Sequence, residues 1–416
     1  MKTTFSPDLE SPSVLTSQAV WQERFADSGR TAVCPALTED VWVRLQSGLE
    51  QWFQAATCFL NSLFTARRLP QEIDCLLNAT RRQQLERWRT VYSAPRGRQM
   101  TWAWPGSADL MLQADGSVQI MDVDFALPSG LERLQFPGCR SLAESRSRLS
   151  QSLFGPGSLP WGTGRAVLLD PGSSGASGHC SEFLSWLLDV PQVTAADLSV
   201  QRGELTVQTA TGRLPVDAVI RRVDDDWLDP NCGRPDSLVG VPGLVRCWQA
   251  GQVSLYNPPG SGLLRHRSIA ALIPECIRVF LGQVPLLDSV PTADLESTSD
   301  RSRIFRNSQH YAFRTDDPLH PARPWFGDDP DAVWRNDLFR RIEADPARWI
   351  ARPLPIPNTG RRSLRLFGSL HRGFHLLPGA LVRMCDADGG APAVIRGDAA
   401  AFPVWRGTLP WPSGSD

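Results

Sequence analysis

Three aspartates in two neighbouring segments could do chemistry together. Asp109 lies in Asp-Leu-Met-Leu-Gln, and Asp122 and Asp124 lie in Val-Gln-Ile-Met-Asp-Val-Asp-Phe; both segments alternate as strands do, on either side of an Ala-Asp-Gly turn signal. Residues two apart on a strand point to one face, so Asp122 and Asp124 share a face and a tight turn places Asp109 near them. Three carboxylates so placed can hold Mg²⁺, whereas the residues alone favour a solvated polar face of a hairpin.

A dense set of charges follows a strand-like apolar segment that ends at Ile220. Its members are Arg221, Arg222, Asp224, Asp225, Asp226, Asp229, Arg234 and Asp236. One interpretation is that they line a cleft at the carboxyl ends of strands, where ligands bind in α/β folds. The other is that they form an internal ion-pair network that locks two subdomains together. The position after a strand favours the cleft.

Other catalytic arrangements find little support in the sequence. No Gly-x-Ser-x-Gly elbow is present, which leaves an α/β-hydrolase unsupported. His179 and Cys180 are adjacent, so their side chains do not face each other. His371 and His375 fall in a segment expected to be strand, and no third metal ligand accompanies them. The nine cysteines form no Cys-x-x-Cys pair, which fits buried thiols in a reducing compartment.

The overall charge and the lysine content restrict the partners. The formal net charge is −1, so the chain has no field that attracts nucleic acid or an anionic membrane. It has no long apolar run, and its first residues lack the apolar stretch of a signal peptide, so we expect a cytoplasmic protein without nucleic-acid or membrane partners. Lys2 is the only lysine, so phosphate contacts must come from arginine or from backbone N–H groups.

The elements that must position these residues alternate between helix and strand. Thr38 is typical of an N-cap, and apolar residues at spacings of three and four predict a helix over 38–64. Further strands are expected at 99–104, 165–170, 204–209 and 213–220, and as a hairpin at 363–383. Further helices are expected at 181–188, 263–282 and 331–344.

The length suggests more than one domain or subdomain. At roughly 150 residues per domain, 416 residues correspond to two or three. We expect an irregular segment at 1–37, a main domain at 38–385 and a Gly/Ala/Pro-rich tail at 386–416. Subdomain boundaries are expected near 155–164, where glycine and proline concentrate, and near 284–300.

The most specific stretch of the chain begins with Val216-Asp-Ala-Val-Ile-Arg-Arg-Val-Asp-Asp-Asp-Trp-Leu-Asp-Pro and ends with Gly251-Gln-Val-Ser-Leu-Tyr-Asn-Pro-Pro-Gly-Ser-Gly. It closely resembles the central block of circularly permuted type 2 ATP-grasp proteins, and the resemblance covers roughly residues 30–385. The resemblance implies an α/β fold of the circularly permuted ATP-grasp kind, with α+β subdomains that clasp ATP and Mg²⁺ and with helical decoration at the N-terminus.

The same resemblance implies roles for individual residues. They are Asp109, Asp122 and Asp124 for Mg²⁺; Arg267, Arg306 and Arg383 for the nucleotide; Arg365 for the transferring phosphoryl group; and Arg221, Arg222 and Asp225 for the substrate. Two departures from the family pattern affect the nucleotide. Ile304 to Thr315 has neither the lysine nor the glycines of a phosphate flap, and Pro353 removes a backbone donor from the adenine hinge.

Two functions follow from the resemblance and its departures. The first is an ATP- and Mg²⁺-dependent ligase that joins a carboxylate to an amine or thiol through an acyl-phosphate, on a peptide or amino-acid-like substrate. The second is a catalytically degenerate homologue that acts as a non-enzymatic binding or regulatory subunit, beside a protein partner or an active paralogue. A weaker third possibility is ligase chemistry with a different phosphate donor.

Overall fold

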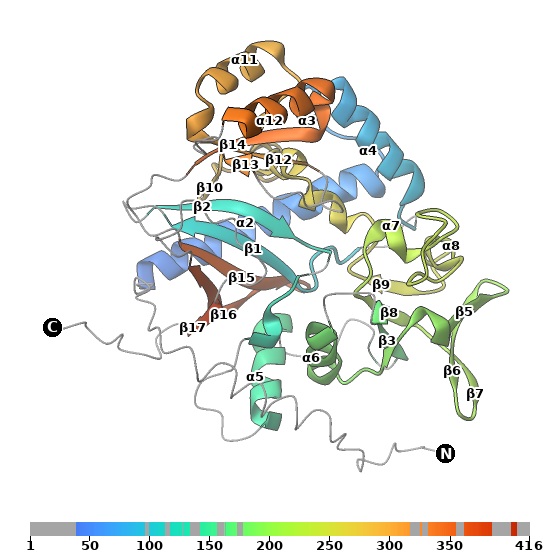
Figure 1. Ribbon diagram of the computed structural model, residues 1–416. Helices are drawn as coiled ribbons and strands as arrows, with labels where there is room; N and C mark the ends of the chain where they lie inside the picture. Colours follow the sequence, from blue (N-terminus) through green and yellow to red (C-terminus); the bar gives the residue numbers. More distant parts are fainter. Residues whose placement is uncertain are drawn as a thin grey trace. The chain divides into compact units, whose positions relative to one another are not determined.

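The computed structural model shows a mixed assembly of helices and several sheets, as expected for the α/β class (Figure 1). It describes residues 39–95, 100–112, 117–126, 128–133, 142–155, 162, 164–172, 178–316, 325–326, 332–354, 362–384 and 401–405. All of these belong to one unit of the chain, residues 37–416. The irregular segment expected at 1–37 lies outside the described residues, and the expected subdomain boundaries stay predictions.

The largest sheet has six strands in the order β10-β2-β1-β15-β16-β17. The strands are β1 (Gly106–Leu112), β2 (Val118–Asp124), β10 (Asp288–Ser289), β15 (Arg362–Leu370), β16 (Phe374–Met384) and β17 (Ala401–Trp405). The two expected hairpins are present as the antiparallel pairs β1–β2 and β15–β16. Because β1 lies between β2 and β15, Asp109 is opposite both Asp122 and Arg365.

Two features beside this sheet differ from the sequence-based expectation. The strand expected at 99–104 is wrong for the described residues 100–104, because Trp104 donates its N–H to the Asn257 side chain and Pro105 has no N–H for a ladder. The Gly/Ala/Pro-rich tail contributes β17, which the composition did not predict. The Ala-Asp-Gly turn between β1 and β2 lies outside the described residues.

A second sheet is fully parallel, in the order β4-β3-β8-β9. Its strands are β3 (Ala166–Leu169), β4 (Gln192–Val193), β8 (Ala218–Arg221) and β9 (Ser254–Tyr256), with the expected helix α6 (Gly178–Leu188) between β3 and β4. The single strand expected at 213–220 is divided. Its first part is β7 (Gly212–Pro215), which joins β5 (Leu198–Gln201) and β6 (Glu204–Thr209) in a separate antiparallel sheet. Asp217 ends this part by accepting the Arg165 N–H at 2.7 Å.

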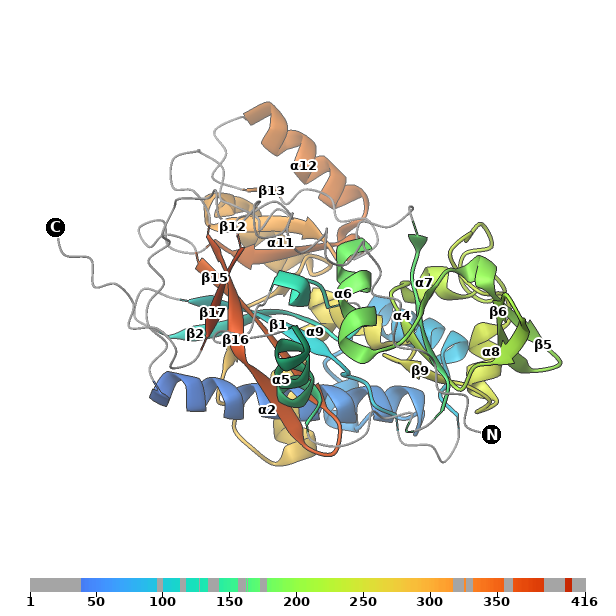
Figure 2. The ribbon, with the colours of Figure 1, turned by 90° about the horizontal axis from the view of Figure 1, so that it is seen from below.

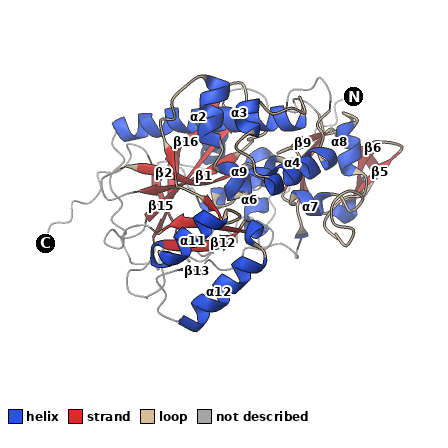
Figure 3. Cartoon of the chain, turned by 90° about the horizontal axis from the view of Figure 1, so that it is seen from above, coloured by secondary structure: helices blue, strands red, loops and turns tan. Residues whose placement is uncertain are grey.

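A third sheet carries arginines on one face and core residues on the other. It has the order β11-β14-β12-β13, with β11 (Ala293–Asp294), β12 (Tyr311–Thr315), β13 (Trp325–Phe326) and β14 (Trp349–Pro353). Phe313 and Ala351 are paired and pack with residues of α11 (Thr298–Arg306) and α12 (Ala332–Ala344), which Figure 3 shows beside this sheet. Side chains alternate along a strand, so Arg314 and Arg352 occupy the opposite face.

Three helical segments complete the frame of the site. The expected helix at 38–64 is α2 (Glu39–Phe64), which crosses the six-stranded sheet with Phe53 packed on Phe125 and Phe374 (Figure 2). The helix expected at 263–282 is broken into η4 (Ser261–Arg265), α9 (Arg267–Ala270), α10 (Ile273–Cys276) and the π-helical η5 (Ile277–Leu281). Pro274 falls in the first turn of α10, where its missing N–H costs nothing.

The third segment, α4 (Ala79–Val91), was not predicted. The side chain of Asn78 caps it by accepting the Arg81 N–H at 2.7 Å.

Among the described helices, none combines the length and the apolar character needed to cross a membrane.

Candidate functional site

Asp122 on β2 is held by two arginines from other elements. Arg267, the first residue of α9, presents its guanidinium edge-on, with Nε 2.8 Å from Oδ1 and Nη2 2.8 Å from Oδ2. Arg352 on β14 donates from Nη1 to Oδ1 at 3.2 Å and to the Met121 carbonyl at 2.8 Å. Burial works to raise the pKa of Asp122, but the charges of Arg267 and Arg352 outweigh it and hold the pKa well below its usual range.

A third arginine, Arg314, belongs to the same cluster. It shares a face of the third sheet with Arg352. Burial lowers the pKa of Arg314 to about 10, and the neighbouring charges of Arg267 and Arg352 act in the same direction, while Asp122 opposes them. Three guanidinium groups therefore gather around one carboxylate. We call Asp122, Arg267, Arg314 and Arg352 the arginine cluster.

Asp109 forms a second pair of the same kind. Its two oxygens accept hydrogen bonds from Arg365, at 2.7 Å from Nε and 2.6 Å from Nη2. Arg365 also donates to the carbonyl and hydroxyl of Ser129, at 3.0 and 3.2 Å. Burial opposes the charged form of Arg365, but Asp109 more than compensates and raises its pKa above the ordinary value. On the same hairpin, Asp124 accepts the Ala126 N–H at 2.8 Å.

These contacts decide whether the hairpin fits a divalent metal. Mg²⁺ is held by carboxylate oxygens and water, with near-ideal octahedral geometry. Both oxygens of Asp109 and both oxygens of Asp122 already accept from guanidinium groups, so a cation bound there would lie beside the positive charges of Arg365 and Arg267, which oppose its binding. Within the described residues, no group of three or more histidine, cysteine, aspartate or glutamate side chains is arranged to hold a metal. The side chains in this arrangement do not fit Mg²⁺.

The three arginines expected at the nucleotide are dispersed. Arg267 belongs to the arginine cluster. Arg306 ends α11 as an exposed side chain, and its Nε donates to the Ser302 carbonyl at 3.2 Å within that helix. Arg383 lies in β16 opposite Ser363, and its side chain is outside the described part of the chain. The segment expected as a flap forms the end of α11, a short 3₁₀ turn and β12.

The residues expected to face substrate are mostly buried. Arg221 is about 1% exposed. Its guanidinium donates to the carbonyls of Asn257 (2.6 Å), Val223 (2.8 Å) and Pro258 (3.2 Å), to the Ser261 hydroxyl (2.9 Å) and to Asp225 (2.8 Å). Arg222 is also buried and donates to the Pro128 carbonyl at 3.0 Å. For these arginines, the internal-network interpretation describes the contacts that the structure shows.

Asp225 joins this network from the start of the short helix α7 (Asp225–Leu228). It accepts the backbone N–H groups of Gly260 at 3.1 Å and Gly262 at 2.9 Å. A Cβ on Gly262 would lie 2.3 Å from the Asp225 carboxylate, so this close approach needs glycine. Burial raises the pKa of Asp225, and Arg221 offsets that effect only in part. Through these hydrogen bonds, Asp225 holds the loop after β9 against the segment that follows β8.

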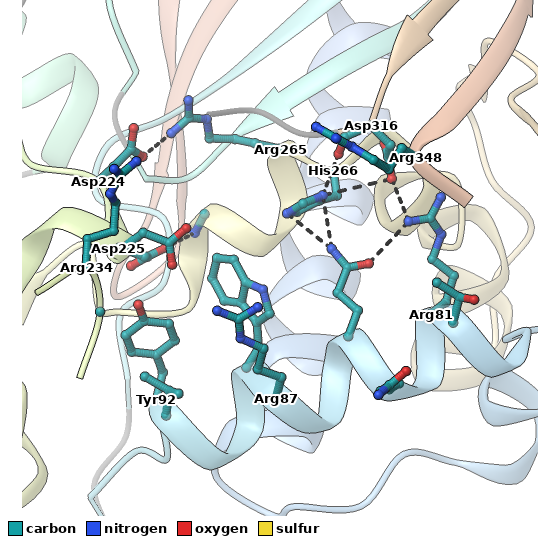
Figure 4. Close-up of a pocket in the computed structure, with 18 of the residues that line it drawn as sticks. Arg81, Arg87, Tyr92, Asp224, Asp225, Arg234, Arg265, His266, Asp316 and Arg348 are labelled. Atoms are coloured by element: carbon teal, nitrogen blue, oxygen red, sulfur yellow. Dashed lines mark hydrogen bonds and ion pairs between the residues drawn. The ribbon is translucent and has the colours of Figure 1, made fainter. Parts of the chain in front are cut away.

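The remaining charges of this stretch line a cavity of about 630 Å³ (Figure 4). The segment after β8 contributes Asp224, Asp225, Asp226 and Arg234, and the segment after β9 contributes Gly262, Arg265 and His266. Because β8 and β9 are parallel neighbours, both segments leave the same edge of the sheet. This is the edge at which α/β sheets bind ligands, and it is where the cleft interpretation expects these charges to lie.

The opposite wall of the cavity comes from α4, which the sequence interpretation overlooked. The cavity-lining residues of this helix include Arg81, Gln84, Arg87 and Trp88, followed by the C-cap residue Tyr92, and their spacing of three and four is the signal that could have revealed it. Arg81 pairs with Asp316 at 3.1 Å, and the Gln84 amide lies 3.2 Å from a His266 ring nitrogen. The sequence interpretation also missed Arg314, which lies in the segment expected as a flap, and Arg352, which precedes Pro353 in the expected hinge.

Comparison with known proteins identifies the fold and the class. The family described as circularly permuted ATP-grasp type 2 matches residues 137–385, well over half of the chain. The chain belongs to this family. The arginine cluster, the Asp109–Arg365 pair and the segments after β8 and β9 all draw residues from the matched region.

Several uncharacterized proteins are similar over most of the chain. Sll0335 of Synechocystis sp. is 27% identical over 337 residues, covering 76% of this chain and 69% of that protein. Rv2411c of Mycobacterium tuberculosis is 23% identical over 329 residues, covering 75% and 59%. A second protein of that organism, Rv2567, is 32% identical over 189 residues, which is 45% of this chain and 21% of its own length. The chain thus spans 59–69% of the two relatives that it matches over most of its own length.

Proposed function

We propose that this chain is a ligase-like ATP-grasp protein that no longer runs a metal-dependent reaction and acts as a binding or regulatory subunit. The family membership supports the ligase-like character. The loss of metal-dependent chemistry rests on one observation. Asp109 and Asp122 are two of the three carboxylates expected at Mg²⁺, and both oxygens of each accept hydrogen bonds from arginines. A partner would then be an active paralogue or another protein.

The segments expected to handle the nucleotide support the same proposal. A phosphate flap needs glycine, because backbone N–H groups must approach phosphate closely. The stretch from Ile304 to Thr315 has no glycine and forms a helix end, a 3₁₀ turn and β12 instead. In the hinge strand β14, Arg352 binds Asp122, and Pro353 offers no N–H to adenine.

Calorimetric titration with ATP, with and without Mg²⁺, tests this proposal. We expect Mg²⁺ to change the ATP affinity by less than about twofold. The Asp124→Asn variant, which keeps the Arg267–Asp122 pair, is expected to behave like the wild type. Micromolar ATP binding that requires Mg²⁺ and is lost in Asp124→Asn would overturn the proposal.

A second candidate, an ATP- and Mg²⁺-dependent carboxylate–amine or carboxylate–thiol ligase, is favoured by the concentration of arginines beside the hairpin. Positive charge of this kind stabilises a transferring phosphoryl group. In this candidate Mg²⁺ is assigned to Asp109, Asp122 and Asp124, ATP to Arg267, Arg306 and Arg383, phosphoryl transfer to Arg365, and a peptide or amino-acid-like substrate to Arg221, Arg222 and Asp225. Phosphate release from ATP that depends on an added amino acid or peptide would support it, and Arg365→Gln should abolish that release.

A further inference from the structure

The cavity beside α4 has features of a ligand site that the arginine cluster lacks. We propose that it binds an uncharged, hydroxyl-rich ligand of the size of a mono- or disaccharide, whose hydroxyl groups meet Arg87 and the Arg265–Asp224 pair and whose ring packs on Trp88. This inference names a ligand for the binding role proposed above and rests on that role. It does not use the ion pairs of Asp109 and Asp122, so the two can fail separately.

The charge of the cavity wall sets the first limit on the ligand. The charged lining residues are five arginines and five aspartates, namely Arg81, Arg87, Arg234, Arg265, Arg348, Asp224, Asp225, Asp226, Asp316 and Asp345. Their formal charges cancel, so the wall as a whole favours neither an anion nor a cation. An ion that enters loses its hydration without meeting a net charge of opposite sign, which opposes binding. An uncharged ligand does not bear that cost.

Most of these charges are already paired inside the protein. Four arginines of the lining are bound to carboxylates, in the pairs Arg81–Asp316, Arg265–Asp224, Arg234–Asp236 and Arg348–Asp345. Asp225 is taken by Arg221 at 2.8 Å. An ionic ligand would have to compete with these pairs for its counter-charge, whereas a hydroxyl group can be added to a pair that stays intact.

The Arg265–Asp224 pair remains accessible to a ligand. Each of its two side chains keeps 22% of its surface exposed, and the pair carries no net charge. A guanidinium group has several N–H donors and a carboxylate has several lone pairs, so one ion pair leaves both with spare hydrogen-bonding capacity. A ligand hydroxyl both accepts and donates, so it can bridge the two side chains without separating them.

Helix α4 supplies two further polar groups. Gln83 and Arg87 lie four residues apart on this helix, so they share a face. Both are exposed and line the cavity, and neither makes an ion pair or a hydrogen bond to another described residue. In Figure 4, Arg87 extends from α4 and no dashed line reaches it. An amide and a guanidinium group that are free in this way can hydrogen-bond to ligand hydroxyl groups.

Trp88 adds an apolar surface to the same cavity. Its side chain is half-buried and lines the cavity. The Tyr92 and His266 rings contact it at 5.4 and 6.0 Å between centroids, with interplanar angles of 58° and 89°, so neither ring stacks on the indole. The C–H face of a sugar ring is apolar and can pack on the part of the indole that stays open.

The size of the cavity agrees with these contacts. A volume of about 630 Å³ falls within the range of small-molecule sites. Paired charges, free hydrogen-bonding groups and an indole surface together favour a ring that carries several hydroxyl groups over an ion or a purely apolar molecule.

Calorimetric titration of the full chain with neutral sugars, in buffer without Mg²⁺ or ATP, tests the inference. The panel is glucose, galactose, mannose, N-acetylglucosamine, maltose, cellobiose, lactose and trehalose. The tightest binder is then compared with its uronate form, in which a CH₂OH group is replaced by a carboxylate, and with its amino-sugar form, which carries an ammonium group. We expect each charged form to bind at least about tenfold more weakly than the neutral sugar.

Variants of the lining provide a second readout. Trp88→Leu should weaken binding of the neutral sugar at least about tenfold, and Trp88→Phe, which keeps an aromatic face, by less than about threefold. Asp224→Asn leaves Arg265 without its counter-charge and should shift the preference towards the uronate form. Arg82→Gln, which changes an exposed neighbour on α4 that pairs with Asp74, is the matched control and should bind as the wild type does.

Two results would overturn the inference. One is the absence of binding by every sugar of the panel at about 10 mM. The other is binding of the uronate or amino-sugar form to the wild type as tight as that of the neutral sugar. Failure here with an ATP titration insensitive to Mg²⁺ removes the ligand and leaves the binding role. Sugar binding together with Mg²⁺-dependent ATP binding leaves the ligand and overturns the non-catalytic role.

Discussion

The arginine cluster and the cavity beside α4 are both rich in charge, but they differ in how that charge is used. In the cluster, both oxygens of Asp122 are taken by guanidinium groups. In the cavity, the charges balance and Arg87 stays uncommitted among the described residues. Charged residues in the right fold are therefore not a site by themselves, and the partners of each group indicate whether it can still bind a ligand.

The largest expected effect concerns the buried network in which Arg221 binds Asp225. We expect Arg221→Met to lower the free energy of unfolding by about 4 kcal/mol, because it leaves the buried Asp225 carboxylate without its counter-charge and removes the donor to the carbonyls of Asn257 and Val223. Chemical denaturation measures this loss. Arg82→Met removes an exposed pair and should cost about 0.5 kcal/mol. Equal losses in the two variants would contradict the assignment of Arg221 to a structural network.

Asp122 should show the next largest effect on stability. Asp122→Asn leaves Arg267 and Arg352 without a compensating charge, and we expect a loss of about 3 kcal/mol at pH 7. Chemical denaturation again provides the measurement. Asp300→Asn removes an exposed pair with Arg303 and is the control. A variant as stable as the wild type would indicate that the cluster is not held by this carboxylate.

The same carboxylate predicts a pH dependence. The pKa of Asp122 is depressed in the folded state, so its contribution is complete above the ordinary aspartate pKa of about 4 and is lost as the pH falls further. The stability difference between wild type and Asp122→Asn should thus be constant from about pH 8 to 5 and shrink below about pH 4. Denaturation curves at stepped pH values measure it. A difference that grows on acidification has the wrong sign for this account.

The smallest effect is expected at the uncommitted arginine of the cavity. Arg87→Gln should change the free energy of unfolding by less than about 0.5 kcal/mol, since no described partner loses a contact. Thermal and chemical denaturation both report on it. A loss comparable to that of Asp122→Asn would show that Arg87 has a structural partner, and would weaken its assignment to a ligand.

Periodicity and turn chemistry predicted much of the frame. The spacing of apolar residues located α2, and alternation located the hairpins β1–β2 and β15–β16. Helix α4 was missed because among its described side chains only Leu85 and Arg81 are buried, so it carries almost no apolar stripe. Its cavity-facing stripe is polar and aromatic instead.

The site itself was harder to predict than the frame. The hairpin aspartates and the charged stretch after β8 could be found in the sequence, but their partners could not. Arg267, Arg314 and Arg352 come from α9, β12 and β14, and only the packing of α9 and of the third sheet beside the hairpin brings them to Asp122. The cavity likewise combines α4 with the segments after β8 and β9 and with Arg348, all distant in sequence.

The central claim is that arginines, and not a divalent ion, hold the hairpin carboxylates. Electron paramagnetic resonance with Mn²⁺, a spectroscopic stand-in for Mg²⁺, tests it directly, because bound Mn²⁺ loses the sharp signal of the free ion. The account predicts that the wild-type chain leaves the signal of Mn²⁺ at about 100 μM undiminished without ATP and, with ATP, causes no loss beyond that of ATP alone. One Mn²⁺ bound per chain, and released by Asp124→Asn, would contradict it.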